Sequence, residues 1–445
     1  MKWLKRLIAV LGLIVLILAV VPFFITLDDY IPDIEIEVSA RLGEPVKIGS
    51  LRAAGLPLPH LTVRGITVGA TEDVKVGKVT VTPDLWSLLD ANMVIKSIEI
   101  DGLALTQVAA WRISGWLPRD NKARRLPLPS TIRVEAIKLD GVVLELDQAT
   151  LGPFDARLSL AQDGGLEAAS IVSRDGSLRV VVKPQQASYL VEAYARNWTP
   201  PLGPQVHFDE LAAKGIATLN GASFSDISAR LYGGAVTARL VVGWRKGMQL
   251  KGSANVSSVD IGPLLRALDK PENLSGQINA RPEFSAHAAS PGQILEALRV
   301  DTPFGVDDGV LHGVDIRKAA TFGSEDGGKG GETRFDRLRG QLNIDRGARR
   351  LTRLDIVSGS LSADGNVTIS PQDQLSGRLN TSIKAASVTA VSIPLNVSGT
   401  LNAPLLYPTG GTVAGAVAGT AVLGPVFGTA IGARVGQWFE NLLGK

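Results

Sequence analysis

The chain of 445 residues contains no cysteine. It therefore has no thiol nucleophile, no disulfide, no thiolate metal site and no cysteine to which a lipid is attached. If the protein lies in an oxidising space, its stability there comes from side-chain packing and backbone pairing alone.

Histidine and aromatic residues are also scarce. The four histidines, at positions 60, 207, 287 and 312, are not spaced as metal ligands are, and no HExxH or GxSxG motif occurs. Aromatic residues make up 5% of the chain, which disfavours sugar-binding sites and protein interfaces that use exposed Trp and Tyr. We therefore predict no catalytic residue, no metal ligand, no cofactor and no enzyme activity.

Charge of one sign is not concentrated anywhere in the body of the chain. The net charge is +3, and beyond the first six residues the only basic cluster is 122–125. Nucleic-acid binding requires an extended basic face, so we expect none. Residues 323–329 resemble a phosphate loop, but Gly330 stands where a Ser or Thr is needed. We predict that 323–332 is a flexible loop.

One long hydrophobic run is present near the N-terminus. Residues 7–27, from Leu7 to Leu27, carry no charge, and as a helix they would be about 31 Å long, which matches the hydrocarbon core of a bilayer. Lys2, Lys5 and Arg6 precede the run, so the positive-inside rule keeps residues 1–6 in the cytoplasm. We predict an uncleaved, single-pass anchor. The alternative, a cleaved secretory signal, would have a shorter apolar run and a small-x-small site.

The pattern beyond the anchor changes from helical to alternating. Residues 31–42 predict one helix, ended by Gly43. Period-two alternation then indicates strands with one wet and one dry face, for example at 60–68, 74–81, 94–100, 157–160, 177–182, 235–242 and 375–383. We expect roughly 25 to 30 strands in antiparallel meanders, with short helices at 83–90, 260–268 and 292–298.

Two pairs of segments are internally similar. Residues 95–105 match 134–144, each with an Asp-Gly turn or bulge, and Phe208-Asp-Glu-Leu211 and Phe335-Asp-Arg-Leu338 each begin a run of strands punctuated by glycine. Such repeats stack side by side, and each unit buries its apolar face against its neighbours. The alternative is chance similarity among β sequences of low complexity.

Three stretches then resemble the AsmA family of bacterial envelope proteins. The first is 34–51, with Gly43-Glu-Pro-Val-Lys-Ile-Gly-Ser-Leu51 after the helix. The second comprises 76–81, 85–89 and 95–102, and the third comprises 259–265, 274–276, 308–316 and 335–355. The resemblance implies an inner-membrane anchor and a β-groove body related to chorein-type bridge-like lipid-transfer proteins. It also implies a role in phospholipid traffic or outer-membrane integrity.

With this resemblance we predict a mainly β fold. A transmembrane helix leads into an elongated antiparallel groove with a few short helices. The expected regions are 1–6 cytoplasmic, 7–27 anchor, 28–150 and 259–408 AsmA-like, 151–258 a middle β-repeat region, and 409–445 a helical hairpin. The alternative to a groove is a sandwich whose apolar faces pack on each other. Candidate groove-lining residues are Ile95, Ile98, Ile100, Leu105, Ile137, Leu139 and Leu144.

The C-terminus carries a stripe of small residues. Glycines recur every four residues within two runs, Gly411, Gly415 and Gly419, then Gly424, Gly428, Gly432 and Gly436. On a helix this spacing lets a second helix approach closely. We predict a glycine-rich hairpin with an amphipathic tail that binds membrane or drives self-association; the alternative is a soluble cap on the sheet edge.

The function expected from the sequence is to bind or conduct phospholipid, from the inner membrane and in the periplasm, and so to maintain the outer membrane. The first alternative is a scaffold that helps outer-membrane proteins assemble by strand addition at its sheet edges. The second is an enzyme acting on envelope polymers, for which no residue is a candidate.

Overall fold

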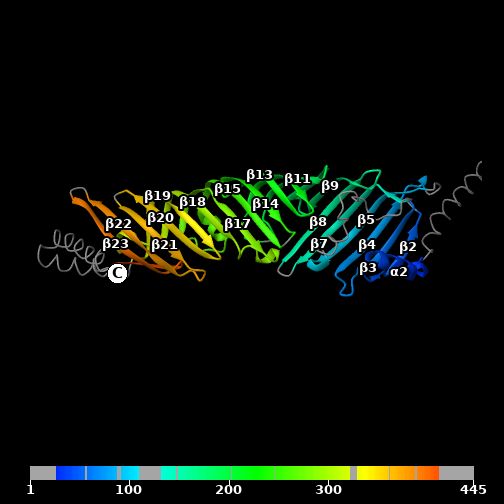
Figure 1. Ribbon diagram of the computed structural model, residues 1–445, viewed down its shortest axis with the longest axis horizontal. Coiled ribbons are helices and arrows are strands. Elements are labelled where there is room, and N and C mark those ends of the chain that lie inside the picture. Colours follow the sequence, from blue (N-terminus) through cyan, green and yellow to red (C-terminus); the bar gives the residue numbers. More distant parts are fainter. Residues whose placement is uncertain are drawn as a thin grey trace, which may run out of the picture. The chain divides into compact units, whose positions relative to one another are not determined.

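The computed structural model describes residues 27–409, apart from 56–57, 88–91, 110–131, 147–148, 202, 246, 321–327, 360 and 386–387. The chain divides into two compact units (Figure 1). One comprises the residues up to Arg196 together with Ile216–Thr218, and the other comprises Asn197–Gly215 and the residues from Leu219 on. We call them the N-terminal and C-terminal units. Within the described residues, no helix is long and apolar enough to cross a membrane. The predicted anchor lies outside them except for Leu27, and so does the glycine-rich hairpin except for Thr409.

The N-terminal unit is a sheet whose strands follow one another along the chain. They are β1 (Val46–Lys47), β2 (Ser50–Ala54), β3 (His60–Val68), β4 (Val74–Pro83), β5 (Met93–Thr106), β6 (Ile132–Val134), β7 (Ala136–Leu146), β8 (Ala149–Leu160), β9 (Leu166–Ser173), β10 (Leu178–Gln185) and β11 (Ser188–Trp198). Most pairs are antiparallel, as alternation and turn spacing predict. The exception is β5, which pairs in parallel with β6 and β7, so the prediction of a wholly antiparallel sheet is wrong at this point.

The first internal repeat explains the parallel pair. Ile98 lies opposite Ile137 and Asp101 opposite Asp140, so each residue of one copy sits beside its counterpart in the other. The two Asp-Gly sequences lie inside continuous strands and form no hairpin turns, and Gly102 and Gly141 adopt φ angles of +67° and +69° within β5 and β7. Glycine reaches this left-handed region without steric cost.

The helix predicted at 31–42 is confirmed as α2 (Ile31–Leu42), preceded by the short 3₁₀ helix η1 (Asp28–Tyr30). Gly43 ends it with a φ of +69°, and its N–H donates to Ser39 O at 2.9 Å, a common helix stop. Val38 and Leu42 pack against a small buried cluster on β1, β3 and β4, formed by Val46, Val68 and Val74, with Ala109. We call these residues the α2 cluster.

The C-terminal unit is a second long meander. Its strands are β12 (Phe208–Thr218), β13 (Gly221–Leu231), β14 (Gly234–Gly243), β15 (Met248–Asp260), β16 (Leu274–Ala280), β17 (Glu283–Ala288), β18 (Arg299–Val314), β19 (Lys329–Asp345), β20 (Ala348–Ser358), β21 (Leu361–Ile369), β22 (Leu375–Ala385), β23 (Val388–Thr400) and β24 (Ala403–Pro408). β16 and β17 together occupy one position between β15 and β18. The runs that begin at Phe208 and Phe335 fall in β12 and β19, each followed by an antiparallel hairpin, β13–β14 and β20–β21.

The far end of this unit has a filled interior. The short helix α5 (Ile316–Ala319) is capped by Asp315, whose carboxylate accepts from Lys318 N at 2.9 Å. Ile316 is fully buried together with Val306 of β18 and Leu395 of β23, and β24 returns to contact α5, β18 and β19. The expectation of an open groove along the whole C-terminal region is therefore wrong over β18–β24, because a helix and the last strand supply apolar side chains to the interior.

The other short elements agree only in part with the sequence. The helix predicted at 260–268 is α4 (Ile261–Ala267), with Asp260 as N-cap. The helix predicted at 292–298 is only the 3₁₀ turn η3 (Pro291–Gln293) followed by turns, and Pro83 ends β4 before a turn at 84–87, while 88–90 lie outside the described residues. The loop predicted at 323–332 is wrong from Lys329 on. There β19 begins, because the backbone groups of these residues pair with β18 although the residues have no apolar side chains.

Candidate functional site

Strand register in the N-terminal unit gathers apolar side chains into two rows. Directly opposed residues of paired strands share one face. The first row, from β3 to β11, is Val63, Val79, Ile100, Leu139, Ala156, Ile171, Val180 and Ala193. The second row is Leu61, Val81, Ile98, Ile137, Leu158, Ala169, Val182 and Val191.

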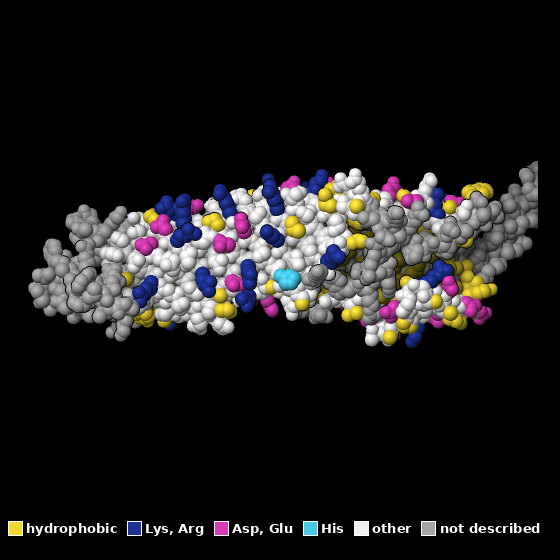
Figure 2. Space-filling view, in the orientation of Figure 1, with side chains coloured by type: hydrophobic (Ala, Val, Ile, Leu, Met, Phe, Trp, Pro, Cys, Tyr) yellow, Lys and Arg dark blue, Asp and Glu magenta, His cyan; other side chains and the backbone are white. Residues whose placement is uncertain are grey.

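The burial of these rows distinguishes them from a packed core. Every member is half-buried except Ala156, which is buried. Eight strands at about 4.8 Å spacing give each row a length of roughly 34 Å. In the view of Figure 2, hydrophobic side chains gather over the strands of this unit. The rows form an apolar face that can hold hydrocarbon.

The predicted lining residues fall into two groups. Ile98, Ile100, Ile137 and Leu139 belong to the two rows, and Ile95 lies beside Pro83 and Val134 at the end of the sheet. Leu105 instead packs against the α2 cluster, and Leu144 is its register partner. The structure thus brings the first group onto a continuous face and places Leu105 in a packed contact. Their role with lipid stays a prediction.

Charged residues occupy the alternate positions of the same strands. Lys78 pairs with Asp101 at 2.6 Å and Lys138 with Glu99 at 2.7 Å. Burial raises the pKa of the Asp140 carboxyl, and repulsion from Asp155, Asp101 and Glu99 raises this pKa further. The parallel repeat therefore sets like charges beside each other on the polar face.

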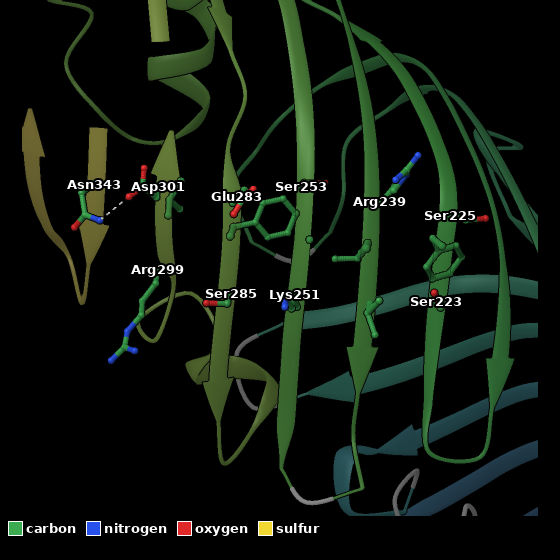
Figure 3. A pocket seen from close by; sticks show the side chains of 16 residues that line it. Ser223, Ser225, Arg239, Lys251, Ser253, Glu283, Ser285, Arg299, Asp301 and Asn343 are labelled. Carbon is green, nitrogen blue, oxygen red and sulfur yellow. Dashed lines mark hydrogen bonds between the residues drawn. The ribbon is translucent and has the colours of Figure 1, made fainter. Parts of the chain in front are cut away.

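A hollow of about 790 Å³ lies over the strands of the C-terminal unit from β13 to β19 (Figure 3). Its volume is in the range of roughly 300–1,000 Å³ that is usual for ligand sites. Register partners run along it in one apolar row, all half-buried, of Phe224, Leu240, Gly252, Phe284, Val300 and, beyond the lining, Ile344. Six strands make this row roughly 24 Å long.

Aromatic rings on these strands lie flat across glycines of the neighbouring strand. A Cβ placed on Gly252 would come within 2.5 Å of Phe284 Cζ, and one on Gly309 would come within 2.4 Å of Phe335 Cζ. Aromatic residues often cover cross-strand glycines in this way. Phe284 and Gly252 both line the hollow. Sequence analysis missed this pair, since its members stand 32 residues apart and only the strand register joins them.

Polar members of the lining alternate with the row. Arg239, Lys251, Glu283 and Asp301 are exposed and adjoin Leu240, Gly252, Phe284 and Val300 in sequence, so their side chains alternate with those of the row. Figure 3 shows them spread over successive strands, with Asn343 donating to Asp301 at 3.5 Å. In the view of Figure 2, charged side chains are dispersed over this unit. The row itself has no titratable side chain, so it offers hydrocarbon contact and no acid–base pair.

The histidines do not converge. His60 Nδ1 lies 2.9 Å from Leu58 O, His207 Nδ1 lies 3.1 Å from Thr199 Oγ1 and His312 Nε2 lies 3.3 Å from Ser275 Oγ. Across the described part of the chain, no three His, Asp or Glu side chains are placed to hold a metal ion. These contacts are local, between a ring and a neighbouring turn or strand.

Comparison with known proteins gives one family. Residues 204–354 match the family model described as the AsmA family, a segment that contains the entire lining of the hollow. It also includes most of the third stretch in which the sequence resembles this family, while the first two stretches lie outside it. No curated protein matches the chain, and no solved structure does.

Proposed function

Because residues 204–354 belong to the AsmA family, we propose that this protein binds or conducts phospholipid on its apolar rows. In this proposal it is anchored in the inner membrane by residues 7–27, works in the periplasm and maintains the lipid balance of the outer membrane. The observation that carries the proposal is the half-burial of the two rows in the N-terminal unit and of the row in the hollow.

Hydrocarbon contact supplies enough free energy for such a role. Burial of one CH₂ contributes about 0.8 kcal/mol, so a chain of sixteen carbons gains on the order of 10 kcal/mol before ordering costs. The rows are apolar over many strands and carry no side-chain hydrogen-bond donor, so they suit acyl chains while head groups stay in water. Movement along them would be passive.

The packed end of the C-terminal unit sets a limit to this path. The core around Ile316 and Leu395 fills the interior over β18–β24, whereas the hollow lies over β13–β19. Within this unit we therefore place bound acyl chains over the hollow and none within the filled end.

The test is mass spectrometry of lipid that co-purifies with the gently extracted full chain. We expect phospholipid, and we expect Ile98→Asp to lower its amount because a carboxylate then interrupts one apolar row. Ser159→Asp is the control, since Ser159 is exposed on β8 beside Leu158 and belongs to neither row. Absence of phospholipid from the wild-type chain would contradict the proposal and favour an assembly scaffold acting through its sheet edges.

A further inference from the structure

The N-terminal sheet carries a group of exposed apolar side chains at the edge formed by one end of its strands. Trp86 is 82% exposed, and Leu58, Leu85 and Met93 are also exposed. Leu58 lies between β2 and β3, and the other three lie between β4 and β5 or at the start of β5. Because Ala54 pairs with His60 and Leu61 with Val81, both loops lie at the same edge. We call Leu58, Leu85, Trp86 and Met93 the apolar lip.

The turn that carries Trp86 is well fixed. Asp84 Oδ1 accepts hydrogen bonds from Trp86 N at 2.9 Å and from Ser87 N at 3.3 Å, and Lys96 Nζ lies 3.0 Å from Asp84 Oδ2. The buried Ser87 hydroxyl donates to Asp84 O and also accepts from Val94 N at 2.9 Å. Single exposed apolar residues are ordinary, but a group of four at one edge, two of them on an ordered turn, is typical of an interaction surface.

The chain that precedes the sheet ends close to the strand that leads to the lip. Leu27, the first described residue, donates its N–H to Leu51 O at 3.2 Å, and Leu51 N donates to Asp28 Oδ1 at 2.9 Å. Leu51 stands on β2, three residues before Ala54 at the lip edge. The uncharged run of residues 7–27 therefore ends beside the strand that leads into the lip, and Tyr30 next to it is exposed as well.

We propose that the apolar lip lies in the interface of the membrane that holds residues 7–27. This inference rests on the anchor in the proposed function and adds the surface by which the sheet contacts the bilayer. Trp and Tyr are enriched at the membrane–water interface, because their rings are apolar with one polar group. The second apolar row passes Val81 and Ile98, next to the lip, so acyl chains pass from the bilayer onto the sheet at this edge.

The absence of cysteine makes a direct test possible. Single-cysteine variants Trp86→Cys, Leu58→Cys and Met93→Cys of the full chain are labelled with the fluorophore NBD and reconstituted in vesicles of phosphatidylethanolamine and phosphatidylglycerol. Thr71→Cys is the matched control, since Thr71 is exposed in the β3–β4 turn at the opposite edge. We expect a blue-shifted emission and strong quenching by nitroxide-labelled lipid at the three lip positions, and neither effect at position 71.

Two results would overturn this inference in different ways. If the chain is held by the vesicles but lip and control positions quench equally little, the lip does not contact lipid, while the anchor and the lipid-binding proposal stand. If the chain does not associate with vesicles at all, the anchor fails and the lip proposal fails with it.

Discussion

Leu240→Asp is the most discriminating single change in the C-terminal unit. Leu240 sits in the row along the hollow, opposite Phe224 on β13 and Gly252 on β15. Thr237, three residues earlier on β14, is exposed, does not line the hollow and, by strand alternation, belongs to the opposite face. The same substitution at these two positions of one strand therefore places one carboxylate along the hollow and the other in water.

The expected effects on stability and on lipid binding differ in size. Leu240 is more buried than exposed, so its replacement removes most of the burial free energy of a leucine, roughly 2 kcal/mol. A hydrocarbon chain lying over the hollow would have to cover the new carboxylate, at a cost of about 3 kcal/mol by the scale for membrane interiors. That corresponds to roughly a 100-fold loss of affinity.

The assay is binding of a fluorescent fatty-acyl probe to the detergent-solubilised full chain, together with urea unfolding of each variant. Leu240→Asp should strongly weaken binding of the probe while the protein stays folded, and Thr237→Asp should bind the probe as wild type does. If both variants bind the probe equally well and both are folded, hydrocarbon does not occupy the hollow, and the reasoning from the alternating faces is refuted.

Two further predictions concern the polar face and the backbone of β5 and β7. Asp140→Asn should raise the urea midpoint at neutral pH, because burial and neighbouring carboxylates raise the pKa of Asp140 and so make its charged form unfavourable in the folded state. This gain should vanish as the pH falls through the raised pKa toward the value of the unfolded chain; a gain that is constant with pH would contradict the electrostatic cause. Gly102→Ala should cost about 1 kcal/mol in urea unfolding, because the residue has a φ of +67° while the nearest atoms to a new Cβ are 3.8 Å away, leaving conformation as the main cost. Unchanged unfolding of that variant would show that alanine adopts this conformation freely.

Local chemistry was sufficient for several elements. Gly43 and the apolar spacing of 31–42 predict α2 at its observed bounds, and the alternation of 60–68 predicts β3. The helix predicted at 260–268 is observed as α4, with Asp260 as its N-cap. In each case the deciding interaction lies within a few residues of the chain, so the sequence contains it directly.

Non-local pairing was the part that the sequence left open. The similarity of 95–105 to 134–144 indicates two alike strands, but their parallel pairing in register follows only from the tertiary structure. Likewise, Lys329 and its polar neighbours form part of β19 because β18 supplies the backbone partners. The four residues of the lip share an edge only because β3 pairs with β4.

By itself, the sequence determined a mainly β body, because alternation of apolar and polar residues gives each strand two unlike faces. It also determined the absence of thiol chemistry and the resemblance that residues 204–354 bear out. Only the tertiary structure decided which apolar faces are covered: over β18–β24 the helix α5 and strand β24 fill the interior, whereas from β3 to β11 and along the hollow the rows stay half-buried. The physical reason is that burial depends on contacts between segments far apart in the chain, and alternation is the same whether or not a partner covers the face.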